Sequence, residues 1–379
     1  MPTSNSLFTP QVAPDRQHSL LQKVATSAAH VPAREQLQRA YDLLPSPDPN
    51  FIKDFQSTGF NARICELYLA AVADSLRMQL TEPQDRPDYL LTHNGQKVWV
   101  EATTANPTAG TAPTTESGGF WEAQDAIAAK LGSPLFSKLN ERYWELPHVH
   151  NMPLVIAIAD FHDSDPRRPS FEALQRYLYA THLRLSSAPG ETVTYDLEPL
   201  QQLGPKNIPA GFFTLPDAAH ISAVLFSNAG TTGKFSRMGL NRFLHPTIRM
   251  LRCGFCFDTD PTAVVPEPFA YLVGTAPETW GQEVVIFHNP NALYPINQEF
   301  FAPLCQYWLK GNKFWHTMPE FFPYVSNTFL YTGSVDSMEA LEQKLLAEGR
   351  RWVLTAKANT GRFTDDLIGF HKQWNPRRS

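Results

Sequence analysis

The sequence has few cysteines, no long apolar run and no excess of positive charge. Its four cysteines (Cys65, Cys253, Cys256 and Cys305) are too few for a disulfide framework in 379 residues, and they favour a reducing, cytoplasmic compartment. No apolar run approaches the roughly 18 residues of a membrane span. Residues 1–32 lack the apolar core of a secretory signal. The net charge of −5 excludes a generally basic surface, so any attraction for nucleic acid must come from local patches.

The composition predicts a globular α/β chain with ample core. Hydrophobic residues make up 42% and charged residues 18% of the chain. Residues 1–49 are expected to form a loose arm over 1–32 and a short helix over 33–44. Residues 50–185 are expected to form an α/β core, and 186–379 a β-rich C-terminal lobe that either extends the sheet of the core or forms its own. In the lobe the pattern predicts a helix over 335–348 and strands over 221–227, 248–258, 269–273, 283–287 and 351–355.

The most informative stretch is a predicted β-hairpin around Asn94-Gly95. Asn-Gly between strand-forming residues favours a two-residue type I′ turn, because both central positions need a positive φ. This turn would place Asp88 opposite Glu101 on one face, with Cβ atoms about 4.5–5.5 Å apart. Two carboxylates at that range repel each other by roughly 3 kcal/mol. The pair therefore indicates either a divalent cation between them, or a solvated hairpin end or another register in which the two acids have no such role.

The elements around the hairpin supply a third acid. Apolar residues from Phe60 to Leu76 follow a helical period, and Glu66 falls beside that apolar stripe, where an unpaired carboxylate is costly. A short strand is expected near 78–81. Helices are expected over 123–131 and 134–146, the second capped by Ser133 and opened by Pro134. The apolar run 152–159 is typical of a buried central strand.

This order of helix, three strands, helix and strand, with Pro87-Asp88 and Glu101-Ala102-Thr103, resembles the PD-(D/E)XK, or restriction-endonuclease-like, nuclease superfamily. The resemblance covers roughly residues 50–165. It implies an αβββαβ core with a mixed sheet flanked by helices, and Glu66 corresponds to the acid that many members carry on the first helix.

One position departs from the family pattern, because Thr103 stands where the family has its lysine. Some members supply the lysine from the following helix, and Lys138 is the best candidate here because Leu135 and Leu139 should turn its face toward the sheet. Lys130 is a weaker alternative. Lys97 shares the strand face of Glu101 but lies four residues away, about 13 Å along the strand.

The resemblance implies a metal-dependent endonuclease that hydrolyses phosphodiester bonds, in antiviral defence of a bacterium or in DNA processing. Asp88, Glu101 and Glu66 would hold Mg²⁺ or Mn²⁺, and Lys138 would complete the catalytic set. The residues do not distinguish DNA from RNA, although DNA is the favoured partner, and they leave open a homodimer or a partner protein. The alternative is an inactive nuclease fold that serves as a nucleic-acid-binding or interaction module.

The C-terminal lobe contains short motifs with ordinary explanations. The segment 228–235 resembles a P-loop but lacks its first glycine and its final Ser/Thr, which excludes a nucleoside-triphosphate site. It is either a plain glycine turn or a loop whose Lys234, Arg237 and Arg242 contact a phosphate backbone. Cys253 and Cys256 are expected to be free thiols.

Overall fold

The computed structural model describes residues 6–107, 120–161, 170–186, 194–199, 202–203, 208–242, 245–257, 266–311 and 313–373. The helices are α1 (Ser19–Thr26), α2 (Val31–Asp42), α3 (Phe51–Phe55), α4 (Phe60–Ser75), α5 (Phe120–Asn140), α6 (Ser170–Tyr179), α7 (Thr232–Arg242) and α8 (Met338–Gln373). The strands are β1 (Gln79–Thr81), β2 (Tyr89–His93), β3 (Gln96–Ala105), β4 (Leu154–Asp160), β5 (Thr181–Ser186), β6 (Thr194–Pro199), β7 (Gln202–Leu203), β8 (Ile208–Pro209), β9 (Ala223–Ser227), β10 (Ile248–Cys256), β11 (Glu267–Leu272), β12 (Val284–His288), β13 (Cys305–Lys310), β14 (Lys313–Thr317) and β15 (Pro323–Thr332).

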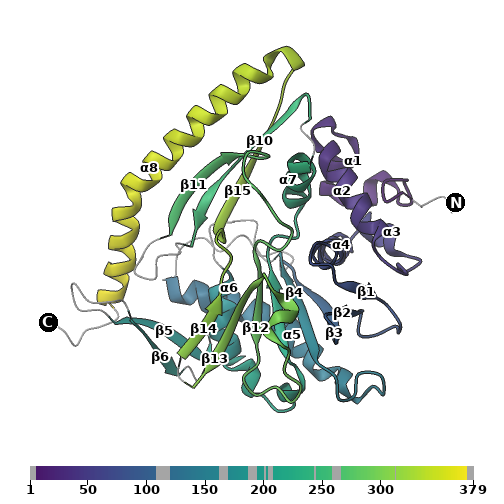
Figure 1. Ribbon diagram of the computed structural model, residues 1–379, viewed down its shortest axis with the longest axis vertical. Helices are drawn as coiled ribbons and strands as arrows, with labels where there is room; N and C mark the ends of the chain where they lie inside the picture. Colours follow the sequence, from purple (N-terminus) through teal and green to yellow (C-terminus); the bar gives the residue numbers. More distant parts are fainter. Residues whose placement is uncertain are drawn as a thin grey trace.

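A large mixed sheet organises the fold, as Figure 1 shows. Its eight strands follow the order β1-β2-β3-β4-β9-β12-β13-β14. Strand β4 pairs in parallel with both β3 and β9, and every residue of β4 is buried. A strand buried on both faces must be apolar throughout, which explains the continuous run Leu-Val-Ile-Ala-Ile-Ala.

Helices flank the large sheet on both faces, because successive side chains of a strand point to opposite sides. Val98 and Val100 of β3 belong to one core cluster together with Leu67 of α4. Trp99, between them in sequence, belongs to a second cluster that includes Leu135 of α5. Strand β3 therefore lies between α4 and α5, and both helices can direct side chains toward its end.

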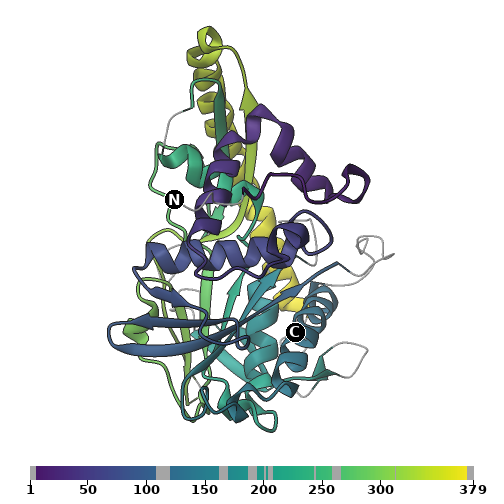
Figure 2. The same ribbon diagram turned by 90° about the vertical axis from the view of Figure 1, so that its right-hand side faces the viewer.

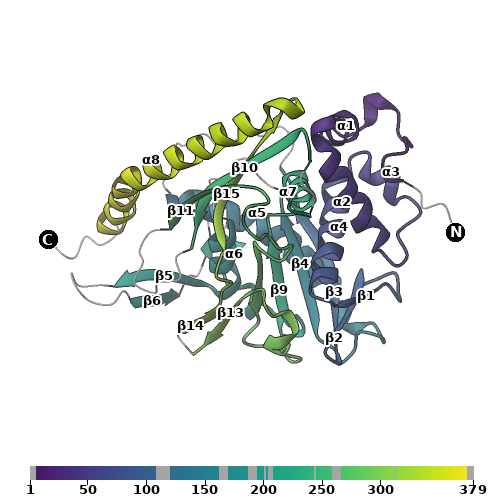
Figure 3. The ribbon, with the colours of Figure 1, turned by 45° about the horizontal axis from the view of Figure 1, so that its top comes forward.

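A second sheet, with the order β11-β10-β15, packs against the long helix α8. Figures 1 and 2 show the N-terminal helices and the start of α8 at one end of the long axis, and the large sheet toward the other. Helix α7 lies beside α2, as Figures 1 and 3 show. The packing is close, because a Cβ added to Gly239 of α7 would lie 2.5 Å from the carbonyl oxygen of Pro32.

The predicted order of helix, three strands, helix and strand is present as α4, β1, β2, β3, α5 and β4. The sequence left open whether the C-terminal lobe extends the sheet of the core or forms its own sheet, and the structure shows both. Strands β9, β12, β13 and β14 extend the large sheet across residue 186, so this boundary does not separate two sheets, whereas β10, β11 and β15 form their own.

Two predicted helices are one in the structure. Ser133 is not an N-cap and Pro134 does not open a helix, because α5 runs through both. Packing against α6 is close at this point, since a Cβ on Gly132 would lie 2.7 Å from the ring of Tyr177. Leu131 and Leu135 are fully buried on either side of the proline. Tertiary packing thus overrides the local signal to start a new helix.

Two further expectations are wrong. Residues 351–355 are not a strand but part of α8, where Trp352 packs against Phe255 with ring centroids 5.5 Å apart. The N-terminal arm is not loose, because it contains α1 and its Leu7 is fully buried. The side chain of Gln56 holds the arm by donating to the carbonyl oxygens of Leu7 and Thr9, both at 2.8 Å.

Within the residues described above, no helix combines the length and the apolar character needed to cross a membrane.

Candidate active site

The hairpin β2–β3 has the register that its turn predicts. Asn94 and Gly95 have φ values of 48° and 78°, in the left-handed region that a type I′ turn requires. His93 pairs with Gln96, and the ladder continues to Tyr89 opposite Val100. Asp88 immediately precedes Tyr89 in the sequence, at the open end of the hairpin, where Glu101 continues β3.

The carboxylates of Asp88 and Glu101 each accept a hydrogen bond from a backbone N–H on the other side of the hairpin. The backbone N–H of Asp88 donates to Oε2 of Glu101 at 3.2 Å. In return, the N–H of Ala102 donates to Oδ2 of Asp88 at 2.7 Å. These two bonds fix both carboxylates at the same end of the hairpin, in the arrangement expected from the sequence.

Lys138 reaches this pair from α5. Its Nζ lies 2.5 Å from Oε1 of Glu101, and the residue keeps 27% of its side chain exposed while Glu101 keeps 5%. Leu135 and Leu139, which flank Lys138 on the helix, are both buried. The helix face therefore points toward the sheet as predicted, even though α5 begins earlier than expected.

Tyr143 completes the contacts of Glu101, and no sequence pattern indicates this role. Its hydroxyl donates to Oε1 of Glu101 at 2.8 Å and lies 3.5 Å from Nζ of Lys138. Burial, and then the negative charge of Glu101, raise the pKa of Tyr143. Arg142, with a φ of 50°, makes the left-handed turn that carries the chain from α5 to Tyr143. A tyrosine just beyond a helix is too common a feature to be recognised as a site residue.

Glu66 of α4 lies near the pair but has its own cation. Arg63, one turn earlier, donates to both carboxylate oxygens of Glu66 at 3.1 and 3.2 Å, and to Asp54 at 2.8 Å. The hydroxyl of Tyr89 donates to Oε2 of Glu66 at 3.2 Å. The sequence predicts that an unpaired carboxylate at Glu66 would be costly, and in the structure Glu66 forms an ion pair with Arg63.

Three acids around the hairpin end have raised pKa values. Burial raises the pKa of Asp88 to about 6, with the nearby charge of Glu101 as the next cause. Burial also raises the pKa of Glu66 to about 7, although Arg63 opposes the shift and Asp88 adds to it. Glu82, which the sequence did not single out, reaches about 7 through burial and the charge of Asp88. Burial and mutual repulsion thus both disfavour the ionised forms of these acids, and acids with raised pKa values are common at functional sites.

Among the described residues, no group of three or more His, Cys, Asp or Glu side chains has the arrangement of a metal site. The free acceptors nevertheless suit a cation that keeps most of its water. Within the described part of the chain Oδ1 of Asp88 makes no hydrogen bond, and Oε2 of Glu101 accepts a single backbone N–H. Mg²⁺ is commonly held by one or two carboxylates together with several waters, so Asp88 and Glu101 fit such an ion.

The other lysine candidates are not in the site. Across the described residues, neither Lys97 nor Lys130 forms an ion pair with a carboxylate. Lys97 is exposed near the turn of the hairpin and pairs through its backbone with Thr92. Thr103, at the position of the missing lysine, pairs with Ile158 of β4.

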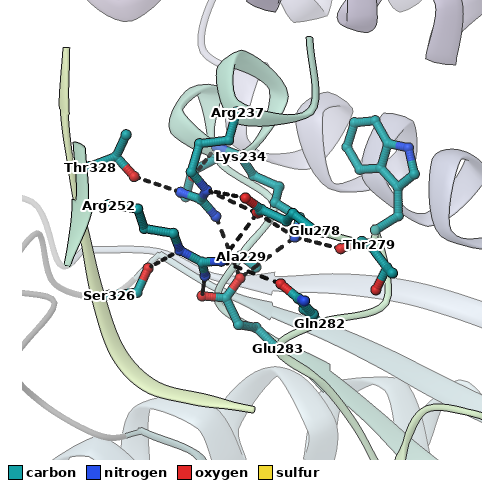
Figure 4. Close-up of polar contacts among 12 residues, drawn as sticks. Ala229, Lys234, Arg237, Arg252, Glu278, Thr279, Gln282, Glu283, Ser326 and Thr328 are labelled. Atoms are coloured by element: carbon teal, nitrogen blue, oxygen red, sulfur yellow. Dashed lines mark hydrogen bonds and ion pairs between the residues drawn. The ribbon is translucent and has the colours of Figure 1, made fainter. Parts of the chain in front are cut away.

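One alternative from the sequence was that Lys234 and Arg237 contact a phosphate backbone. This alternative is wrong for both residues, because they are buried in an ionic cluster. Figure 4 shows them directed at Glu278 and Glu283, together with Arg252. Lys234 and Arg252 are fully buried, and Arg237 keeps 5% exposure. Nζ of Lys234 lies 2.9 Å from Glu278 and also donates to the carbonyl oxygen of Thr279 at 2.7 Å.

This ionic cluster (Lys234, Arg237, Arg252, Glu278 and Glu283) joins the two sheets. Its cations come from α7 and β10, and its acids flank the segment that leads into β12. Burial lowers the pKa of Lys234 to about 8 against the opposing effect of its acids. The glycine-rich segment before α7 therefore serves packing. The side chain of Arg242, the third residue of that expectation, lies outside the described residues.

The remaining motifs have the ordinary roles expected of them. All four cysteines are free thiols, three of them buried and Cys256 partly exposed. No family model, curated protein or solved structure matches the chain.

Proposed function

We propose that the chain is a metal-dependent endonuclease that hydrolyses phosphodiester bonds in DNA. The observation that carries the proposal is the contact between Lys138 and Glu101, at 2.5 Å, beside the carboxylate of Asp88. A cation-binding acid pair with an adjacent ammonium group can activate water and stabilise the charge that develops when a phosphodiester is hydrolysed.

Each side chain has a role in this proposal. Asp88 and Glu101 would hold Mg²⁺ or Mn²⁺, which when bound activates water and neutralises charge on the phosphate. Lys138 would orient the attacking water or stabilise the charge that develops on the phosphate oxygens. Tyr143 holds Oε1 of Glu101, which leaves Oε2 on the side of Asp88.

The order of elements supports a restriction-endonuclease-like core. Helix α4, the strands β1, β2 and β3, helix α5 and strand β4 occur in the order of that superfamily. In this proposal Asp88 and Glu101 would correspond to the acids of its motif, and Lys138 from α5 would replace the lysine missing at Thr103. The same resemblance underlies our proposal of a role in antiviral defence or DNA processing.

A specific observation favours a second candidate, a nuclease fold that binds nucleic acid without cleaving it. Arg63 neutralises Glu66, and the described residues contain no group of three metal-binding side chains. In that case Lys138 would serve as a phosphate contact, and binding would weaken with salt.

Cleavage assays separate the two candidates. Purified protein is incubated with plasmid DNA, single-stranded DNA and RNA, each with Mg²⁺, with Mn²⁺ and with a chelator. The proposal predicts metal-dependent cleavage of DNA that is lost in Asp88→Asn and kept in Asp85→Asn, a matched change at an exposed acid three residues away. Cleavage of RNA alone would contradict the choice of DNA. Binding without cleavage of any substrate would favour the second candidate.

A further inference from the structure

A cavity of about 160 Å³ lies among helices α2, α4 and α7 and the segment that contains Trp280. Figures 1 and 3 show the three helices side by side. Its walls include the apolar side chains of Leu43, Met238 and Trp280. The volume is that of about five water molecules in the liquid, which suits a ligand much smaller than a drug.

A buried amide without a partner lines this cavity. Gln36 keeps only 7% of its surface exposed, yet its side chain makes no hydrogen bond with any described residue. Both of its polar side-chain atoms retain contact with open space, which at this position is the cavity. The amide therefore has its hydrogen-bonding atoms available to a ligand or water in the cavity.

Opposite charges stand on two walls. Arg39 of α2 and Asp74 of α4 both line the cavity, and both are exposed. Neither forms an ion pair with another residue in the described part of the chain. The cavity thus offers one cation and one anion that the fold leaves available.

The surroundings hold the cavity open. At one end of α2 the close approach of Gly239 to Pro32 fixes the spacing of α2 and α7. On the other side, the hydroxyl of Tyr68 on α4 donates to the carbonyl oxygen of Trp280 at 2.7 Å. Lys234 of the ionic cluster binds the adjacent carbonyl of Thr279. A preformed site of this kind binds with little ordering cost.

We propose that this cavity binds a small zwitterion with an apolar body, of the chemical class of a free aliphatic or thioether α-amino acid. The carboxylate of the ligand pairs with Arg39 and its ammonium group with Asp74. Its side chain packs against Met238 and Trp280, and Gln36 contributes a hydrogen bond to a polar group of the ligand. The site is separate from the Asp88–Glu101 pair and does not depend on the nuclease proposal.

Titration calorimetry of the full chain with L-methionine and L-leucine tests the proposal. Binding is expected with a dissociation constant between about 10 µM and 1 mM, the range for a ligand of this size. L-Methionine methyl ester lacks the carboxylate charge, and N-acetyl-L-methionine lacks the ammonium charge. Each should bind about three- to fivefold more weakly, because each loses one of two ion pairs with an exposed side chain.

Two exposed substitutions assign the charges without threatening the fold. Arg39→Gln should have the same affinity for L-methionine and for L-methionine methyl ester. Asp74→Asn should have the same affinity for L-methionine and for N-acetyl-L-methionine. Arg350→Gln and Asp85→Asn change exposed charges that do not line the cavity and should keep the full discrimination. Absence of binding by the wild type would overturn the proposal. So would unchanged discrimination in Arg39→Gln and Asp74→Asn, because the ligand would then lie elsewhere.

Discussion

Replacing Asp88 by asparagine should stabilise the folded chain at alkaline pH when no divalent cation is present. The pKa of Asp88 is raised from 3.8 to about 6, by burial and then by Glu101, so the ionised carboxylate is less favourable in the folded chain than in the unfolded one. Asparagine removes this charge. Its side-chain oxygen can still accept the hydrogen bond from Ala102.

The size of the effect follows from the shift. A shift of roughly two pH units corresponds to about 3 kcal/mol, and screening at this partly exposed carboxylate reduces the expected gain to about 2 kcal/mol. Because the folded pKa lies above the unfolded one, the destabilisation grows as the pH rises and is complete above about 6. The gain should therefore be largest near pH 8 and fall to about 1 kcal/mol near pH 4.5.

Urea denaturation is measured once in a chelator and once in Mn²⁺ without a chelator, which tests the effect of the charge and the effect of the metal separately. Against a dissociation constant of about 1 mM, roughly 10 mM Mn²⁺ should stabilise the wild type by about 1.4 kcal/mol and leave Asp88→Asn unchanged. Asp85→Asn should behave as the wild type in both conditions.

Two results would refute this reasoning. A less stable Asp88→Asn in chelator at pH 8 would mean that native partners stabilise the carboxylate more than burial destabilises it. An identical response of the wild type and Asp88→Asn to Mn²⁺ would mean that Asp88 does not bind metal.

Two other predictions concern the ionic cluster and the contacts of Glu101. Glu278→Gln should lower the free energy of unfolding by about 3–5 kcal/mol in urea denaturation, because three buried cations then face one carboxylate; a loss below about 1 kcal/mol would contradict this. Burial would raise the pKa of Glu278, but its cations outweigh burial and lower it to about 2, so its stabilising contribution is present above about pH 4.5 and lost as the pH falls toward 2. Tyr143→Phe removes one hydrogen bond to Glu101 and leaves Lys138 in place, so kcat for DNA cleavage should fall about tenfold with KM nearly unchanged. A change in KM alone would indicate that Tyr143 contacts the substrate instead.

Local signals predicted the part of the site that depends on a short segment. The turn at Asn94-Gly95 determines the register of its hairpin, and the register determines which residue meets Glu101. Lys138 was found because buried leucines on either side fix the direction of its helix face. Such inferences need only the periods of strands and helices.

Features that depend on distant segments were not predictable from local pattern. Lys234 lies in a segment with the composition of a phosphate-binding loop, but its partner Glu278 is 44 residues away in sequence. The helix α5 passes through Pro134 because of its contact with α6. In the same way, strands of the C-terminal lobe join the large sheet, and only their pairing with β4 and β9 reveals this.

The rate of DNA cleavage by Lys138→Ala in Mn²⁺ tests the central claim most directly. If Lys138 acts beside Asp88 and Glu101 in a nuclease site, the substitution should lower the rate about 10²-fold or more. Affinity for DNA and for Mn²⁺ should stay close to that of the wild type, and Lys130→Ala should cleave normally. A Lys138→Ala protein that cleaves DNA at the wild-type rate would contradict the proposed site.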